Sequence, residues 1–155
     1  MTNTETIYHF YSSLQEGNIE DLLSCYDPQV RFSDPAFGEL QGEHAHYMWR
    51  MLVSKMSSEI KIDVNHVYDQ NGRIHCSWTA DYAFGKKQRK VHNVVSSTFT
   101  FKNNRIITHD DFFDLWSWTR QALGAPGYLL GWSSLMQRKM VERNQLYLKK
   151  YMKKK

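Results

Sequence analysis

Residues 59–84, EIKIDVNHVYDQNGRIHCSWTADYAF, decide the fold of this chain. Apolar and polar residues alternate on both sides of the Asn-Gly pair at residues 71–72, which is the pattern of a β-hairpin. Two further strand-like runs follow at residues 89–101 and 105–113, and short polar turns separate all of these runs. The sequence therefore predicts four consecutive antiparallel strands.

The first 56 residues follow another pattern, because their apolar residues recur every three or four positions. This spacing is typical of helices that bury one face. We expect a first helix from Thr4 to residues 17–18 and a second helix that stops at Pro28. A third helix is expected over residues 43–56, after a short strand at residues 30–33. Helices followed by a strand meander predict an α+β domain with the helices on one face of the sheet.

The C-terminal part of the chain extends this domain. Residues 125–132 are apolar and rich in glycine, and we expect them to form a loop. Ser133 is a suitable N-cap for a last helix. No linker or repeat interrupts the chain, so residues 1–124 are expected to form the domain and residues 125–155 an apolar loop plus a basic helix that belong to it.

Composition limits the class of protein. The 155 residues are 41% hydrophobic and 14% aromatic, which suits one domain with a core and excludes a disordered chain. No apolar run approaches the roughly 20 residues that span a bilayer, and the N-terminus lacks the features of a signal peptide. We therefore expect a cytoplasmic protein with two buried thiols. The absence of CxxC, nucleophile-elbow and phosphate-loop motifs argues against zinc ribbons, serine hydrolases and nucleotide-dependent enzymes.

The positive charge gathers at the C-terminus. Residues 138–155 hold eight basic residues against one acidic residue, whereas the whole chain carries a formal charge of +4. The rest is therefore mildly acidic. Such a helix could contact an anionic membrane or nucleic acid, although most basic terminal helices are simply solvated. Its basic residues do not pair with aromatic ones as in a base-stacking surface. We expect no nucleic-acid partner and at most a weak membrane contact by this helix.

Two acidic motifs could carry chemistry. Asp34, in an Asp-Pro pair after a short strand, could act as a base at the rim of a site, although Asp-Pro is also common in simple turns. His109 and Asp111 point to the same side of the last strand, where the histidine could orient the carboxylate for proton transfer. Burial beside aromatics would raise the pKa of such a carboxylate. The alternative is an exposed acidic edge in which Asp114 caps a helix.

Other candidates are weaker. Tyr11 belongs to the apolar stripe of the first helix, which favours a core tyrosine with a satisfied hydroxyl. His44 and His46 diverge on a helix by about 200° and cannot chelate one ion. His109 and Asp111 lack an evident third ligand. We therefore expect no metal site.

In this order, the motifs resemble the nuclear-transport-factor-2-like superfamily, and within it the SnoaL-like polyketide cyclase and ketosteroid-isomerase-like branch, over residues 5–124. Tyr11 in FYSSLQEGN matches the tyrosine that donates a hydrogen bond to the substrate oxyanion in the isomerases. Asp34 in VRFSDPAFG matches their general base, and Ser97 stands where they have a protonated aspartate. RIITHDDFFDLWSWTRQALG is similar to the cyclases, with His109 and Asp111 on their His-x-Asp pattern.

The resemblance implies a cone-shaped curved antiparallel sheet closed by three N-terminal helices (a cystatin-like α+β barrel), here with an extra C-terminal helix. It also implies a homodimer formed through the sheet. The alternating strands would line a pocket for a small hydrophobic molecule, unless the same residues are simply core. The expected substrate-binding residues are Trp78, Tyr82, Asn93, Val95, Ser97 and Phe99.

Two functions follow as expectations. The first is proton transfer without a cofactor on a hydrophobic carbonyl substrate, by a ketosteroid-isomerase-like isomerase or a polyketide-cyclase-like lyase. Asp111 with His109, or else Asp34, would take the proton, and Tyr11 would stabilise the enolate with Ser97. The second is a non-catalytic domain of the same fold that binds a small hydrophobic ligand or dimerises.

Overall fold

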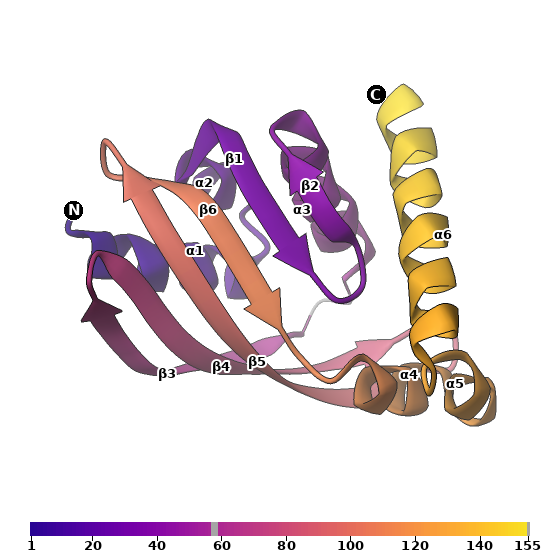
Figure 1. Cartoon of the computed structure of the whole chain (residues 1–155). Coiled ribbons are helices and arrows are strands. Elements are labelled where there is room, and N and C mark those ends of the chain that lie inside the picture. The colour runs from indigo at the N-terminus through magenta and orange to yellow at the C-terminus, as the bar shows by residue number, and fades with distance from the viewer. Residues whose placement is uncertain (57–58, 155) are drawn as a thin grey trace.

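The computed structural model describes residues 1–56 and 59–154 (Figure 1). Lys155, part of the expected basic helix, lies outside these residues. The helices are α1 (Asn3–Glu16), α2 (Ile19–Ser24), α3 (Glu43–Lys55), α4 (Leu115–Leu123), α5 (Ala125–Leu130) and α6 (Ser134–Lys153). The strands are β1 (Tyr26–Asp34), β2 (Gly38–Gln41), β3 (Lys61–Gln70), β4 (Arg73–Phe84), β5 (Arg89–Lys102) and β6 (Arg105–Phe112).

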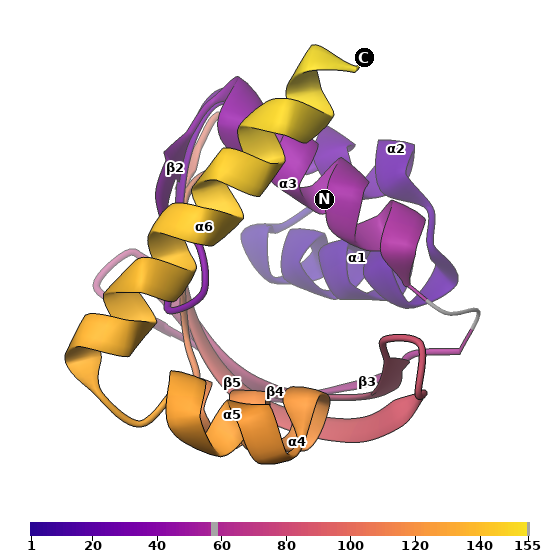
Figure 2. The same ribbon diagram turned by 90° about the vertical axis from the view of Figure 1, so that its right-hand side faces the viewer.

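The strands form one sheet in the order β2-β1-β6-β5-β4-β3. The predicted antiparallel meander is confirmed over β3 to β6. The sheet as a whole is mixed, because β1 and β6 run parallel. Figures 1 and 2 show the sheet curving around α1, α2 and α3, with α4, α5 and α6 gathered at one end of the molecule. The α+β architecture is therefore as expected, but the sheet keeps two free edges, β2 and β3, and stays open.

The start of β1 corrects the expected second helix. That helix ends at Ser24, and Tyr26 begins a strand that runs through Pro28. Proline lacks a backbone N–H and is tolerated in a strand only where the ladder does not need one. The pairing of β1 with β6 is irregular between Tyr26 and Arg31, which satisfies that condition. The N-cap of α1 is likewise Thr2 rather than Thr4, and Thr2 forms a capping box with Glu5.

The expected loop at residues 125–132 was wrong, because residues 125–130 form the short helix α5. The glycines there allow two helices to touch. A Cβ atom at Gly127 would lie 1.9 Å from the carbonyl oxygen of Thr119 on α4, and one at Gly131 would lie 2.3 Å from the Thr119 hydroxyl. The apolar, glycine-rich composition therefore reflects close helix packing. Ser133 caps α6 as predicted.

The core lies between the concave face of the sheet and the helices α1 and α3. Its largest fully buried side chains are aromatic and come from α1, β1 and β5: Phe10, Tyr11, Tyr26, Phe32 and Phe99. Within the described residues, no helix combines the length and the apolarity needed to cross a membrane.

Candidate active site

Two carboxylates meet on neighbouring strands of the concave face. In the parallel pairing of β1 with β6, Phe32 lies opposite His109. Both side chains are buried, at 1% and 0% exposure, so this pair faces the core. Side chains alternate along a strand, so two residues further on Asp34 and Asp111 face the same side on adjacent strands. The β5–β6 register adds Ser97 opposite Asp111. The sheet thus brings Asp34, Ser97, His109 and Asp111 together.

Asp111 is held by two hydrogen-bond donors. Its Oδ1 accepts a hydrogen bond from Ser97 Oγ at 2.5 Å and lies 2.7 Å from His109 Nε2. The Asp111 side chain is only 6% exposed. The other oxygen, Oδ2, accepts no hydrogen bond from the described residues. Every buried side-chain polar atom of these residues has a partner, so Oδ2 is not one of the buried atoms. Oδ2 is therefore the free end of an otherwise anchored carboxylate.

His109 is positioned from its other side by two aromatic residues. Its Nδ1 lies 2.7 Å from Tyr26 Oη, which accepts a hydrogen bond from Trp49 Nε1 at 2.8 Å. An indole N–H can only donate, so the Tyr26 hydroxyl proton is left to bond Nδ1. A neutral ring then carries its proton on Nε2, facing Asp111. An imidazolium would leave the Tyr26 proton without a partner.

Aromatic rings enclose the His109 ring completely. The Trp49 indole lies nearly parallel to it, at 10°, and the Phe99 ring centroid is 4.3 Å away. Phe32 and Phe10 meet it edge-on at 5.1 Å and 5.5 Å. The ring therefore cannot rotate without disturbing the core, which fixes the donor that faces Asp111.

Tyr11 and Ser97 use their protons inside the protein. Ser97 Oγ donates to Asp111, accepts from Trp78 Nε1 at 2.7 Å, and lies 3.1 Å from Tyr11 Oη. Tyr11 is thus the donor in its pair with Ser97. Burial and the Asp111 charge raise the pKa of Tyr11, which keeps its hydroxyl protonated. The two donors that the resemblance implies for a substrate oxyanion are therefore engaged, because Tyr11 donates to Ser97 and Ser97 donates to Asp111.

The three acids of the last strand and its end have separate roles. Asp110 lies on the opposite face, where Arg31 contacts both of its oxygens at 2.7 and 2.8 Å. This ion pair lowers the pKa of Asp110. Asp114 caps α4 by accepting from the Ser117 N–H. Of the three acids, only Asp111 lies in the interior, so they do not form the exposed acidic edge that was the alternative prediction.

Asp34 both forms a turn and presents a carboxyl group. Its Oδ1 accepts hydrogen bonds from the backbone N–H groups of Ala36 and Phe37, at 2.9 and 2.6 Å. The pKa of Asp34 is raised to about 7, mainly by burial and also by the Asp111 charge, against the lowering effect of these two amides. Near neutral pH, Asp34 is thus able to hold or release a proton.

This raised pKa predicts how stability depends on pH. The pKa of Asp34 is about 7 in the folded protein, whereas its ordinary value is 3.8. At pH values between these two, the native state therefore binds more protons than the unfolded chain. The free energy of unfolding should therefore fall as pH rises from about 4 to about 7. Asp34→Asn retains an acceptor for both amides, so it should gain stability relative to wild type across that range. Urea midpoints at several pH values check this, and a pH-independent difference would contradict it.

Helix α6 holds the loop that carries Asp34. Asn144 Nδ2 donates to the Ala36 carbonyl at 2.8 Å, and Gln145 Nε2 donates to the Phe37 carbonyl at 2.6 Å. The amides of the same two loop residues bind Asp34. Sequence reasoning missed these contacts, because they join residues 108 positions apart.

We expect the double variant Asn144→Ala, Gln145→Ala to loosen this loop. Amide hydrogen exchange at Ala36 and Phe37 should quicken by roughly tenfold or more, because the carbonyls of these residues lose the side-chain donors that tie the loop to α6. Gln137→Ala is the matched control, since Gln137 Nε2 donates to the Gly131 carbonyl, away from Asp34. Equal exchange at Ala36 and Phe37 in the double variant and the control would show that α6 does not hold the loop.

The remaining expected pocket residues are mostly packed. Trp78, Val95 and Phe99 are at most 7% exposed and belong to the core. Tyr82 and Asn93 are half-buried, and Tyr82 Oη accepts from Trp118 Nε1 on α4.

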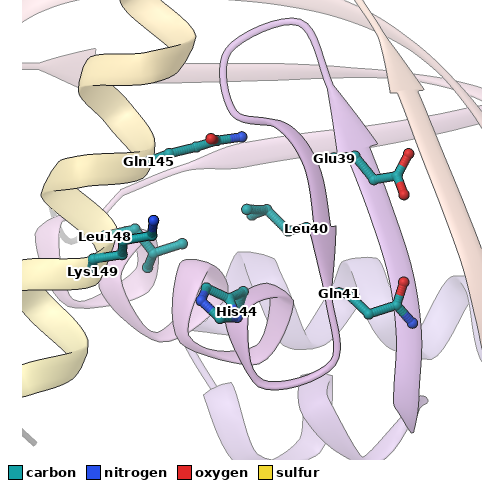
Figure 3. A pocket seen from close by; sticks show the side chains of 7 residues that line it. All are labelled: Glu39, Leu40, Gln41, His44, Gln145, Leu148 and Lys149. Atoms are coloured by element: carbon teal, nitrogen blue, oxygen red, sulfur yellow. The ribbon is translucent and has the colours of Figure 1, made fainter.

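Two cavities of the structure lie outside the Asp111 network. One of about 230 Å³ lies between β2, α3 and α6, where Gln145 and Leu148 reach it (Figure 3). Another of about 610 Å³ lies beside Tyr82 at the β4–β5 end of the sheet. Of the expected pocket residues, Tyr82 is the one that lines this second cavity. Among the described residues, no group of three His, Cys, Asp or Glu side chains is arranged to hold a metal ion.

Solved structures show the same fold. TerC co-crystallised with polyporic acid is 17% identical, with 77% of this chain and 96% of that chain covered and a TM-score of 0.67. An LEH-like epoxide hydrolase of M. tuberculosis is 14% identical, with 82% and 92% covered and a TM-score of 0.66. A protein with a ketosteroid-isomerase-like fold from Catenulispora acidiphila, in complex with trimethylamine, is 14% identical, with 82% and 98% covered and a TM-score of 0.69.

Sequence comparison is more specific. No curated protein matches the chain significantly. The SnoaL-like domain family matches residues 7–109, a segment that runs from α1 to the buried histidine of β6. Because this segment makes up well over half of the chain, the protein belongs to the SnoaL-like domain family.

Proposed function

We propose that this SnoaL-like protein transfers a proton on a hydrophobic carbonyl compound without a cofactor, in an isomerisation or an aldol-type cyclisation. The observation that carries the proposal is the placement of Asp34 and Asp111 on one face of adjacent strands, with one oxygen of each carboxyl group anchored by protein donors. Two neighbouring carboxyls with different surroundings divide naturally into an acid and a base.

Asp111 is the proposed base. Hydrogen bonds from Ser97 and His109 hold Oδ1, which leaves Oδ2 to accept a proton. Oδ2 would take a proton from the carbon next to the substrate carbonyl, and the C–H electron pair would move into the enolate. His109 does not touch the substrate in this scheme; it orients the carboxylate as a positioning residue.

Asp34 is the proposed acid. The protons of Tyr11 and Ser97 are engaged within the network, so another donor is needed for the enolate oxygen. A carboxyl group with a pKa of about 7 is partly protonated at neutral pH and can donate that proton. Return of the proton from Asp111 to a different carbon, with Asp34 taking its proton back from the enol oxygen as the carbonyl re-forms, would complete an isomerisation. Attack of the enol carbon on a second carbonyl, with Asp34 taking its proton back as the first carbonyl re-forms and Asp111 giving its proton to the new alkoxide, would complete a cyclisation.

Solvent exchange tests this proposal without knowledge of the natural substrate. The protein is incubated in D₂O with a panel of hydrophobic ketones and 1,3-dicarbonyl compounds, and loss of the α-proton signal is followed by NMR. We expect exchange well above the buffer blank for some of the panel. No exchange for any compound shown to bind would reject proton transfer.

The packed interior favours a second candidate, a non-catalytic domain that binds a small hydrophobic ligand. The cavity of about 610 Å³ beside Tyr82, Ala83 and Val91 has room for one, although most of its lining residues are polar, and none of its lining residues belongs to the Asp111 network. A molecule that co-purifies with the protein and is recovered unchanged after incubation, and that Tyr82→Ala releases, would support this candidate over the enzyme.

A further inference from the structure

The C-terminal extension exposes large apolar side chains in a short stretch. Tyr128, Leu129, Trp132 and Leu135 are each between 56% and 70% exposed. They come from α5, from the connection to α6 and from the first turn of α6. Single exposed apolar residues are common, but four within eight positions mark a contact surface.

The exposed stripe of α6 continues from this apolar cluster and is strongly basic. Val141, Asn144, Gln145 and Leu148 face the body of the protein. The opposite stripe, at helical spacing from Leu135, is exposed and holds seven cations and a single anion. Its charged members are Arg138, Lys139, Glu142, Arg143, Lys149, Lys150, Lys153 and Lys154.

The helices that carry the two features lie on one side of the molecule. Figure 2 looks onto this side, with α6 crossing it and α4 and α5 at its foot. A helix of 20 residues is about 30 Å long, so the stripe is an extended and nearly straight surface.

We propose that this surface binds an anionic lipid membrane, with α6 lying along the headgroups and the side chains of Leu129, Trp132 and Leu135 entering the boundary with the acyl chains. Charge complementarity carries the choice of partner, because phospholipid headgroups supply the negative charge that the stripe lacks. The apolar cluster supplies the second, salt-resistant attachment that stable membrane binding requires.

Other occupants fit less well. A second copy placed symmetrically on this surface would set one basic stripe against another, which is repulsive. Nucleic acid would satisfy the cations but would leave the leucines of the apolar cluster without an apolar partner. This inference is independent of the proposed catalysis, since it uses none of the interior residues.

Vesicle co-sedimentation of the full chain tests the proposal. We expect binding to phosphatidylcholine vesicles with about 30 mol% phosphatidylserine, and at least roughly tenfold weaker binding to phosphatidylcholine alone. Each cation should strengthen binding roughly fivefold. The triple variant Arg138→Gln, Lys139→Gln, Lys150→Gln should therefore bind roughly a hundredfold more weakly. Its matched control removes three exposed cations from the turns at the other end of the sheet: Arg73→Gln, Lys102→Gln, Arg105→Gln.

The apolar part is tested separately. The double variant Leu129→Ser, Trp132→Ser should abolish the membrane binding that survives about 0.5 M salt. The control Tyr8→Ser, Tyr68→Ser removes two exposed rings elsewhere and should leave that binding unchanged. Equal losses for variants and controls would overturn the proposal, as would equal binding to both vesicle types. Binding to a DNA duplex without vesicle binding, or a dimer in solution that the Leu129 and Trp132 changes dissociate, would also overturn it.

Discussion

The variant Asp111→Asn should lose about 10² to 10⁴-fold in α-proton exchange while its melting temperature stays within a few degrees of wild type. Asparagine keeps an oxygen where Oδ1 accepts from Ser97 and His109, so the buried hydrogen bonds persist. It puts an amide NH₂ group, which cannot take up a proton, where Oδ2 would act as the base. Activity and stability should therefore separate.

Comparison with Asp111→Ala shows whether the separation is real. Alanine leaves the Ser97 and His109 donors facing an empty, buried position, which costs about 1–3 kcal/mol for each unsatisfied group. This variant should be both inactive and clearly less stable. Asp110→Asn is the matched control, because Asp110 is the adjacent carboxylate on the outer face and pairs with Arg31. It should exchange α-protons at the wild-type rate.

The rate measurement is made at saturating and at limiting substrate for any compound that exchanges. A base that acts only in the transition state lowers kcat and kcat/KM together. If Asp111→Asn keeps the wild-type rate, or if only KM changes, Asp111 is not the base. Asp34→Asn, measured alongside, distinguishes the two carboxyls: loss of the acid should weaken exchange most for substrates whose enolate is least stable on its own.

Local patterns were sufficient for much of the fold. The alternation that begins at residue 59, together with the polar turns between residues 69 and 104, predicted four strands. The alternating direction of side chains in a strand placed His109 and Asp111 on one side of β6, and the structure joins them at 2.7 Å. The failures at residues 26–28 and 125–132 arose where a local signal was overridden. Tyr26 fits the helical spacing but lies in β1, where its hydroxyl group forms a buried hydrogen bond. Gly127 lacks a side chain and so allows α5 to pack closely against α4.

The supporting residues of the site could not be found in this way. Tyr26 and His109 are 83 positions apart, and nothing in the local pattern of either indicates the other. The parallel pairing of β1 with β6, which sets Asp34 beside Asp111, is also a long-range choice. Alternation further identifies which residues face the interior but not whether they fill it. Trp78 and Phe99 were expected to line a pocket, and they pack in the core.

The variant Tyr26→Phe should destabilise the protein by about 2–5 kcal/mol, although it removes a single oxygen atom. That oxygen accepts from Trp49 Nε1 and bonds His109 Nδ1, and all three side chains are at most 5% exposed. Its loss leaves one buried donor and one buried acceptor without partners, and neither can reach water. For a domain of this size the melting temperature should fall by roughly 5–15 °C.

Tyr82→Phe is the matched control for this prediction. Tyr82 also accepts from a tryptophan N–H, that of Trp118 at 2.7 Å, but both residues are half-buried and water can replace the lost oxygen. The expected loss is below about 1 kcal/mol. Thermal and urea unfolding of both variants measure the difference, and similar shifts would mean that the buried network contributes little to stability.

The ¹⁵N chemical shifts of His109 add a direct reading: wild type should carry its proton on Nε2, and without the Tyr26 hydroxyl that preference should rest on Asp111 alone. An Nδ1–H ring in wild type would contradict the assigned order of donors, and with it the proposed role of His109 in orienting Asp111.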